Sequence, residues 1–324
     1  MKLLLACGAL LCMVLLLRAV TVVEDFSTNP LARDWRVFGD ASLFHWNATN
    51  QNLEVTWDSS HTNSYYYLPL KTILDKDDDF SLSFDLEFLG YASGTTSNKP
   101  YAAEAAIGLL NLDNATQTNF SRGSGVSAAY GPENLVEFDF FPSFSTFLPT
   151  IAQVIVSTNN TWLYNHDNLL DMPPGDLFHI EMDYAAATRT LTTVTTLNGS
   201  QYGATQTIQV PTNGFDFRVA AFSVSSYSDQ NSASSIHAHG VIDNIVVTTP
   251  PPPVQNLIGK LANTVWQVTF LGRSNWLYTL ERTVDFSAWT NVSATVSGNA
   301  TNLVLQDTNP PTDQAFYRVR AERP

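Results

Sequence analysis

Hydrophobic and polar residues alternate along much of this chain with a period of two. Residues 80–88 show the pattern most clearly, because five apolar residues alternate there with four polar ones: Phe80, Leu82, Phe84, Leu86 and Phe88 with Ser81, Ser83, Asp85 and Glu87. Alternate side chains of a β-strand leave opposite faces. The pattern therefore predicts a strand with one buried face and one face in water.

Similar apolar or alternating runs recur between polar, turn-forming stretches. We expect strands at 53–57, 65–70, 80–89, 105–112, 135–141, 152–158, 177–184, 190–197, 217–224 and 240–247. Residues 185–188 and Asn198-Gly199 have turn composition, and no long amphipathic helix is apparent. Many strands without helical connectors predict an all-β fold in which two antiparallel sheets pack as a sandwich.

A run of four prolines, residues 250–253, follows Thr249. Such a run is extended and cannot donate hydrogen bonds to a sheet. It predicts a β-sandwich over residues 22–249, a linker at 250–255 and a small C-terminal β module at 256–324.

The first residues have the composition of a signal peptide. Lys2 precedes an apolar run, Leu3–Leu17, that Arg18 closes, and this run is short for a membrane span. We expect residues 1–21 to be removed on export, to the periplasm, the cell surface or the medium, and no membrane span to remain. Cys7 and Cys12 both lie in this leader, so the exported chain has no disulfide and depends on a large core.

The formal net charge is -14 and the isoelectric point is about 4.6. Binding of nucleic acid needs clusters of Lys and Arg, which this chain lacks, so we exclude nucleic acid as a partner.

Several segments resemble the concanavalin A-like lectin and glucanase superfamily, whose members are jelly-roll sandwiches. The resemblance covers about residues 22–249 and is carried by EDFSTNPLARDW, FSLSFDLEF, VEFDFF, FHIEMDYAAATRTLTTVTTLNG and VIDNIVVT. The C-terminal segments NWLYTLERTVDFSAWTNV, DTNPP and AFYRVRA look like a small β module of secreted bacterial proteins. The resemblance implies a jelly-roll fold and a lectin-like or glucanase-like protein of bacterial type.

Retaining glucanases of glycoside hydrolase family 16 carry the motif Glu-x-Asp-x-(x)-Glu. Glu137 and Asp139 match its nucleophile and supporting acid, but the acid/base position holds Phe141 or Pro142. A retaining mechanism needs two carboxyl groups, so the resemblance implies an incomplete catalytic site. An acid recruited from another strand would restore the site, and the residues available for it are Asp85, Glu87, Glu181 and Asp183.

Legume-type lectins use a Val-Glu-Phe-Asp strand to bind metal, and residues 136–139 match it. The Asn, Asp and His expected to follow are missing, and Ca²⁺ needs six or more oxygen ligands, so the inherited metal site is not expected. Independently, Asp85/Glu87, Glu137/Asp139 and Glu181/Asp183 are carboxylate pairs on polar strand faces. On neighbouring strands they would form an acidic row for Ca²⁺ or a hydroxyl-rich ligand. On different sheets they are the polar side chains that any half-buried strand turns toward water.

His237 and His239 lie on one face of a predicted strand near Asp243, and these three residues are the candidate ligands for a transition metal. A third strong ligand is missing. Polar side chains on the exposed face of a strand produce the same His-x-His pattern without binding a metal. No other cofactor is expected.

Aromatic rings stack on sugar rings, so exposed aromatic residues are further candidates for a binding site. The expected ligand-binding residues are Glu137, Asp139, Phe141, Asp85, Glu87, Tyr66 and Trp162. The sequence favours an exported, non-catalytic protein that binds a polysaccharide or glycoconjugate. The alternatives are a family 16-like glycoside hydrolase with a relocated acid, and a structural surface protein without a small ligand.

Overall fold

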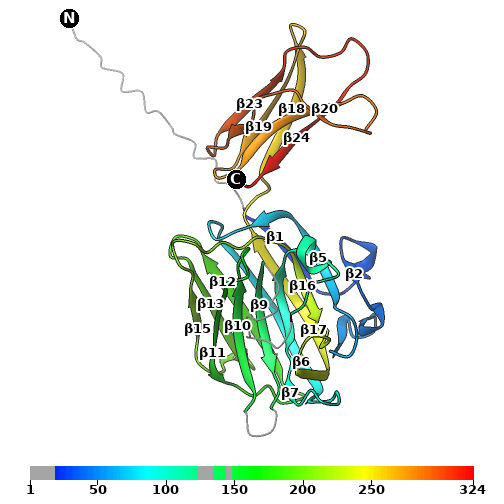
Figure 1. Ribbon diagram of the computed structural model, residues 1–324, viewed down its shortest axis with the longest axis vertical. Coiled ribbons are helices and arrows are strands. Elements are labelled where there is room, and N and C mark those ends of the chain that lie inside the picture. The colour runs from blue at the N-terminus through cyan, green and yellow to red at the C-terminus, as the bar shows by residue number, and fades with distance from the viewer. Residues whose placement is uncertain (1–18, 123–133, 144–147) are drawn as a thin grey trace, which may run out of the picture.

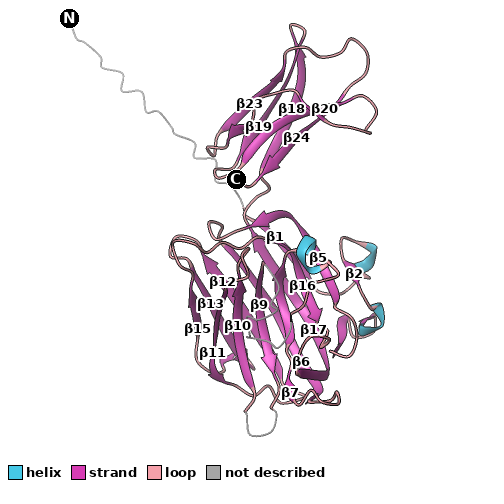
Figure 2. Ribbon diagram, viewed as in Figure 1, coloured by secondary structure: helices cyan, strands magenta, loops and turns pink. Residues whose placement is uncertain are grey.

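The computed structural model describes residues 19–122, 134–143 and 148–324, and they form two β bodies joined by a short connection (Figure 1). Strands dominate the structure (Figure 2), and the helices of the described residues are single turns: η1 (Pro30–Ala32), η2 (Ala41–Leu43) and α1 (Leu112–Ala115). The expected all-β fold is confirmed, and all ten predicted strands are present. The expected leader lies almost entirely within residues 1–18, outside the described residues.

The larger body is a sandwich of two sheets. The ten-stranded sheet has the order β14 (Ser200–Gln201), β13 (Thr190–Leu197), β12 (Leu177–Ala185), β6 (Phe80–Ser93), β17 (Ser234–Thr249), β4 (Asn52–Asp58) and β3 (Phe44–Asn47). β1 (Val20–Glu24) and β7 (Tyr101–Ala102) pair with β17, and β15 (Gln206–Gln209) pairs with β13. All these pairings are antiparallel except that of β7 with β17.

The second sheet has seven strands and is entirely antiparallel. Its order is β11 (Trp162–Leu169), β10 (Thr150–Val156), β9 (Leu135–Phe141), β8 (Ala105–Leu110), β16 (Val219–Ser226), β5 (Ser64–Leu74) and β2 (Arg36–Phe38). The two sheets enclose one large apolar core, to which β6 contributes all five of its alternating apolar residues. The period of two in residues 80–88 thus places one face of β6 in the core, as the sequence predicts.

A second apolar cluster covers the opposite side of the seven-stranded sheet. It includes Tyr65, Val154, Trp162 and Tyr227, with Phe120 packed at its edge. The seven-stranded sheet is therefore buried on both faces over its central strands, which explains why β9 and β10 read as nearly continuous apolar runs.

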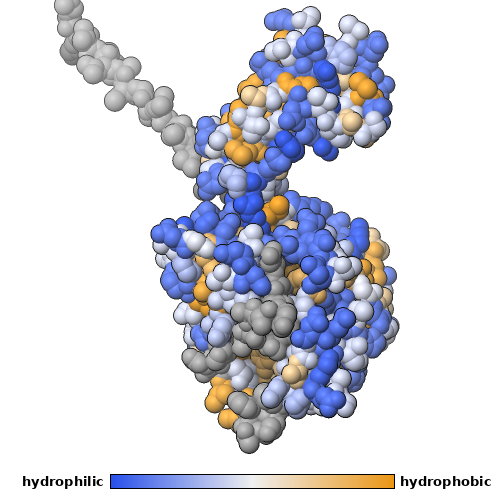
Figure 3. All heavy atoms as spheres, in the orientation of Figure 1, coloured by the Kyte–Doolittle hydropathy of each residue, from blue (hydrophilic) through white to orange (hydrophobic). Residues whose placement is uncertain are grey.

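The small body begins after the proline run, since β17 ends at Thr249 and β18 starts at Val254. One of its sheets has the order β18 (Val254–Ala262), β19 (Val265–Gly272) and β23 (Asn302–Asp307). In the other, β20 (Leu277–Thr283) pairs with β21 (Thr290–Asn291), β22 (Val296–Ser297) and β24 (Phe316–Glu322). It has its own core, which includes Phe270, Trp276, Tyr278 and Leu280. On the side shown in Figure 3, hydrophilic residues cover most of the sandwich, and hydrophobic patches appear on the small module.

Buried ion pairs join the two bodies. Asp78 of the sandwich bonds the guanidinium groups of Arg273 and Arg323, and Asp75 lies 2.9 Å from Arg323. Both arginines also lie over the ring of Trp276. Because a buried charge without its partner is costly, these pairs favour one arrangement of the module on the sandwich. Among the described residues, no helix is both long and apolar enough to cross a membrane.

Strands β8 and β9 approach each other closely at Gly108, which pairs with Glu137. A Cβ atom there would lie 2.3 Å from the Val136 carbonyl oxygen and 2.7 Å from the Glu137 Cα. We expect Gly108→Ala to lower the free energy of unfolding by about 1–3 kcal/mol, measured by chemical denaturation, because the strands must separate. Gly90→Ala in β6 is the control, since nothing lies within 4 Å of its added Cβ. Equal stabilities of the two variants would contradict the prediction.

Candidate functional site

Glu137 and Asp139 point away from the main core, on the same side of β9, and are nevertheless sealed from solvent. Their exposed fractions are 1% and 0%, and Arg122, also 0% exposed, lies between them. Arg122 Nε is 3.3 Å from Glu137 Oε2, and Arg122 Nη2 is 2.5 Å from Asp139 Oδ2. The Tyr227 hydroxyl donates a hydrogen bond to the other Glu137 oxygen. The two carboxylates are therefore held by a guanidinium group and a phenol.

A third carboxylate, Glu104, lies 3.7 Å from Arg122 Nη1. We call Arg122, Glu104, Glu137 and Asp139 the Arg122 cluster. The Arg122 guanidinium also lies over the Trp162 ring, 4.7 Å from its centroid. Neither Glu104 oxygen has a hydrogen-bond partner, and Asp139 Oδ1 has none. Among the described residues, one cation thus faces three acids in a dry environment, which is a costly arrangement unless protons neutralise part of the charge.

Burial raises the pKa of all three carboxyl groups, and the nearby Arg122 only partly offsets this effect. Burial alone would lower the pKa of Arg122, but Asp139, Glu104 and Glu137 outweigh it, so the guanidinium stays charged. The cluster therefore favours protonated carboxyl groups and a permanent cation. This chemistry stabilises a buried site and does not present a free nucleophile to solvent.

The Arg122 cluster and the cores contain most of the residues that the sequence nominated for ligand binding. Glu137 and Asp139 are buried in the Arg122 cluster, Trp162 is buried in the second apolar cluster, and the half-buried Phe141 packs against that apolar cluster. Tyr66 lies in the core between the sheets, with its ring stacked 5.1 Å from that of Trp35. In this structure these side chains form the interior, and solvent reaches only part of Phe141.

The remaining nominated acids lie on the opposite surface of the sandwich, on the outward side of the ten-stranded sheet. We call this side the outer polar face. Asp85 and Glu87 of β6 lie there beside Glu181 and Asp183 of the neighbouring β12. Two of the three carboxylate pairs thus share a sheet face, as the acidic row requires. The third pair, Glu137 and Asp139, belongs to the other sheet, so the three pairs do not form one row, and the alternative of different sheets applies to that pair.

The positions of these four acids also decide whether one of them could serve as the catalytic acid beside Glu137 in a glycosidase. Asp85, Glu87, Glu181 and Asp183 face outward from one sheet, whereas Glu137 is on the far side of the other. None of the four lies beside Glu137. The acids that do share its cation are Glu104 and Asp139.

Asp85 on the outer polar face is already engaged. Its Oδ1 lies 2.7 Å from His179 Nδ1, and Asn244 donates a hydrogen bond to its Oδ2. Partial burial raises the pKa of Asp183, with a further contribution from Glu181. Partial burial likewise raises the pKa of Asp243, with Asp85 contributing. The acids of this face therefore repel one another, and a hydrogen-bonding or cationic ligand would relieve that repulsion.

His237 and His239 lie side by side on β17, with ring centroids 4.7 Å apart. Asp243 is four residues further along the strand, about 13 Å away, and pairs in register with Asp85. The structure therefore separates Asp243 from the two histidines. In the described part of the chain, no three His, Cys, Asp or Glu side chains are already gathered closely enough to hold a metal.

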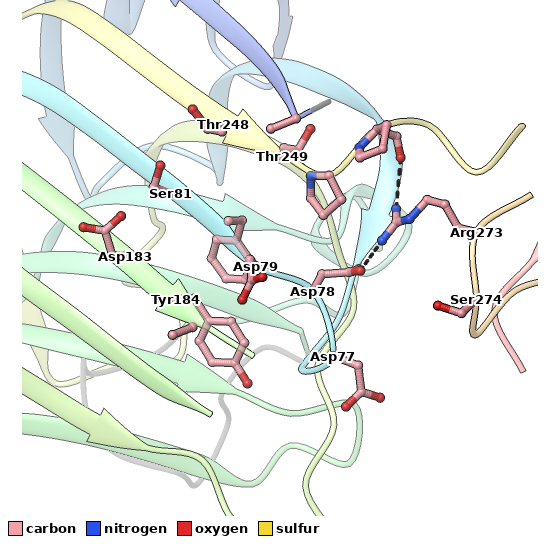
Figure 4. A pocket seen from close by; sticks show the side chains of 15 residues that line it. Asp77, Asp78, Asp79, Ser81, Asp183, Tyr184, Thr248, Thr249, Arg273 and Ser274 are labelled. Atoms are coloured by element: carbon pink, nitrogen blue, oxygen red, sulfur yellow. Dashed lines mark hydrogen bonds and ion pairs between the residues drawn. The ribbon is translucent and has the colours of Figure 1, made fainter. Parts of the chain in front are cut away.

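An open cleft lies where the small module meets the edge of the sandwich. This junction cleft has a volume of about 620 Å³, within the range typical of small-molecule sites. Figure 4 shows Asp183, Ser81 and Thr248 on its sandwich side and Arg273 on the side of the module, bonded to Asp78. The apolar parts of its wall come from Phe80, Tyr184 and two prolines: Pro250 and Pro251.

Strand register explains how the cleft receives its polar row. Asp183 of β12 pairs with Ser81 of β6, and Ser81 pairs with Thr248 of β17. The hydroxyl of Thr248 lies 3.2 Å from that of Thr21 on β1. Four adjacent strands thus contribute a row of oxygen-bearing side chains at one end of the outer polar face. Such a row can donate and accept hydrogen bonds with a hydroxyl-rich ligand.

The sequence did not identify Arg122, Glu104 or the junction cleft. Arg122 stands alone in a polar loop, and only its burial against β9 reveals its role. Ser81 and Asp183 do carry a signal, because each occupies an outward position of an alternating strand. The register that joins them and the module that closes the cleft arise only in three dimensions.

No family model matches the sequence, and a search of curated proteins found no match. Solved structures similar to this chain include peanut lectin with a nine-residue peptide, at 16% identity and a TM-score of 0.48, covering 72% of this chain and 97% of that one. Two further matches are lectin II from Ulex europaeus, at 14% identity and a TM-score of 0.45, and lectin I from the same plant with a methyl fucoside, at 14% identity and a TM-score of 0.44. Each of these two matches covers 72% of this chain and 98% of the lectin chain. At these values the likeness says nothing of what this chain binds.

The Arg122 cluster leads to a prediction about stability and pH. Arg122→Met leaves three buried acids without their cation, so we expect a loss of about 3–5 kcal/mol in the free energy of unfolding at pH 7. A carboxyl group whose pKa is raised by folding stabilises the fold below its unfolded pKa, and this contribution is lost as pH rises through the folded pKa. The loss caused by Arg122→Met should therefore be smaller at pH 4 than at pH 7.

Chemical denaturation at both pH values measures this difference. The variant that also carries Glu137→Gln and Asp139→Asn should recover part of the stability at pH 7, because two of the unpaired charges are removed. An equal loss at pH 4 and pH 7 would show that packing of the Arg122 side chain, and not its charge, dominates.

Proposed function

We propose that this protein binds carbohydrate without cleaving it, and that the junction cleft is the binding site. The observation that carries the proposal is the row of Asp183, Ser81 and Thr248 along a cleft of about 620 Å³ with an apolar wall. Sugar sites combine acceptors and donors for hydroxyl groups with apolar surface for the faces of the ring. The cleft supplies both from neighbouring residues.

The charges around the cleft favour particular carbohydrates. Among the described residues, Asp77, Asp79 and Asp183 line it, and Arg273, the cation among them, is engaged by Asp78. Acids outnumber cations among the described residues that line the cleft, and the whole chain carries a formal charge of -14, so an anionic sugar would be repelled. The ligand we propose is therefore a neutral or amine-bearing polysaccharide or glycoconjugate, and sulfated and uronic acid polymers are disfavoured.

The absence of cleavage is proposed from the Arg122 cluster. Retaining hydrolysis needs a nucleophile and an acid on either side of the bond that breaks, both in contact with substrate. Glu137 is buried against Arg122 and Tyr227, and the outward acids of β6 and β12 lie on the other surface. The leader composition supports the further proposal that the protein acts outside the cytoplasm.

The site is tested by binding measurements on a panel of neutral, amine-bearing and anionic glycans. Asp183→Asn removes the charged acceptor, and we expect it to weaken binding roughly 10- to 100-fold, since a hydrogen bond to a charged group contributes about 1.5–3 kcal/mol. Ser81→Leu should fill the cleft and weaken binding at least as much. The matched controls are Glu181→Gln and Ser83→Leu, which lie two residues along the same strand faces and do not line the cleft.

Equal effects of Asp183→Asn and Glu181→Gln would place the ligand elsewhere on the sandwich. If the protein bound none of the glycans in the panel, the result would favour a structural surface protein. Running the panel with and without Ca²⁺ tests whether a hard cation takes part.

The same glycans should be assayed for released reducing ends. We expect none from the unaltered protein. Release that Glu137→Gln abolishes would overturn the non-catalytic proposal and show that Glu137 becomes accessible to substrate.

A further inference from the structure

Three histidine and aspartate side chains converge at the edge of the outer polar face near the end of β4. Asp58 Oδ2 lies 3.8 Å from His61 Nε2 and 3.8 Å from His237 Nε2. Strand register explains the meeting, because His237 of β17 pairs directly with Asp58 of β4, and His61 follows in the next turn. We propose that Asp58, His61 and His237 bind a divalent transition metal such as Zn²⁺.

The donor atoms are oriented for this role by their other partners. Asp58 Oδ1 accepts hydrogen bonds from the Ser60 amide and hydroxyl, at 3.0 and 2.6 Å, which leaves Oδ2 to face the two histidines. His61 Nδ1 lies 2.7 Å from Asp40 Oδ2, which leaves Nε2 directed at Asp58. A carboxylate on the far nitrogen of a histidine is the usual arrangement around a metal-binding imidazole, since it fixes the ring and its tautomer.

The donors stand slightly wider apart than in a closed metal site. Bonds of about 2.0–2.2 Å place the donors of a tetrahedral ion roughly 3.4 Å apart. Closing the two separations between Asp58 and its histidines from 3.8 Å to that value needs a movement of about 0.4 Å in each, so metal binding requires the side chains to rotate. The exposed fractions of the side chains are 39% for His61, 19% for Asp58 and 45% for His237, so an ion can enter from solvent.

The site differs from the one that sequence reasoning nominated. His237 is common to both, but Asp58 and His61 take the places of Asp243 and His239. The His239 Nδ1 atom lies 3.0 Å from the Thr56 hydroxyl, and Asp243 lies much further along β17. Two histidines and one carboxylate leave coordination positions for water, so the ion would remain accessible to a further ligand.

Titration of the purified protein with Zn²⁺ by isothermal calorimetry tests the site, with Ca²⁺ as a comparison that imidazole ligands disfavour. We expect one Zn²⁺ bound, at least a tenfold loss of affinity in His61→Ala and in His237→Ala, and a loss of roughly 10- to 100-fold in Asp40→Asn. His179→Ala is the matched control, because His179 lies on the same sheet face beside Asp85 and should leave Zn²⁺ binding unchanged.

Thermal unfolding without metal shows that each variant folds, because these side chains are partly exposed. Zn²⁺ binding that survives in both His61→Ala and His237→Ala, or that His179→Ala reduces equally, would overturn the proposal. No detectable binding of Zn²⁺ to the unaltered protein would overturn it as well. These outcomes do not depend on the glycan measurements, which use a different part of the surface.

Discussion

The alternation of residues 80–88 is the constraint on which both the core and the proposed binding surface depend. A strand with a period of two sends every second side chain to the same face, so β6 places Phe84 in the core and Ser81 and Asp85 outside. β6 is also bonded on both sides, by β12 and β17. A shift of one residue in its register would bury its acids and expose its phenylalanines, which makes this register strongly specified.

Charge is handled differently on the two sheets. On the outer polar face the acids remain in contact with water, where neighbours such as His179 and Asn244 offset part of their repulsion. On the seven-stranded sheet the acids Glu137 and Asp139 are buried, and a single guanidinium holds them. The same residue type in the same two-residue spacing therefore yields a solvated surface in one sheet and a sealed ionic cluster in the other.

The small module completes the proposed site as well as extending the chain. Without it, this end of the outer polar face would be open to solvent, but Arg273 lines the junction cleft and is fixed there by Asp78. A second arginine near the C-terminus, Arg323, bonds the same aspartate. Asp78 therefore holds the module and also lines the junction cleft, which joins the architecture of the two bodies to the proposed recognition of carbohydrate.

The sequence by itself determined the elements, because side-chain alternation is a local property that residues such as Phe80 to Phe88 display directly. It predicted ten of the strands, the buried and exposed faces of β6, the hairpin after Ala185 and the break at the proline run. It could not decide which strands are neighbours, and so could not separate Glu137 and Asp139 from the acids of β6 and β12. Only the tertiary structure brought Arg122 to Glu137, His61 to Asp58 and Ser81 to Asp183, because these contacts depend on sheet order, register and loop packing between residues distant along the chain.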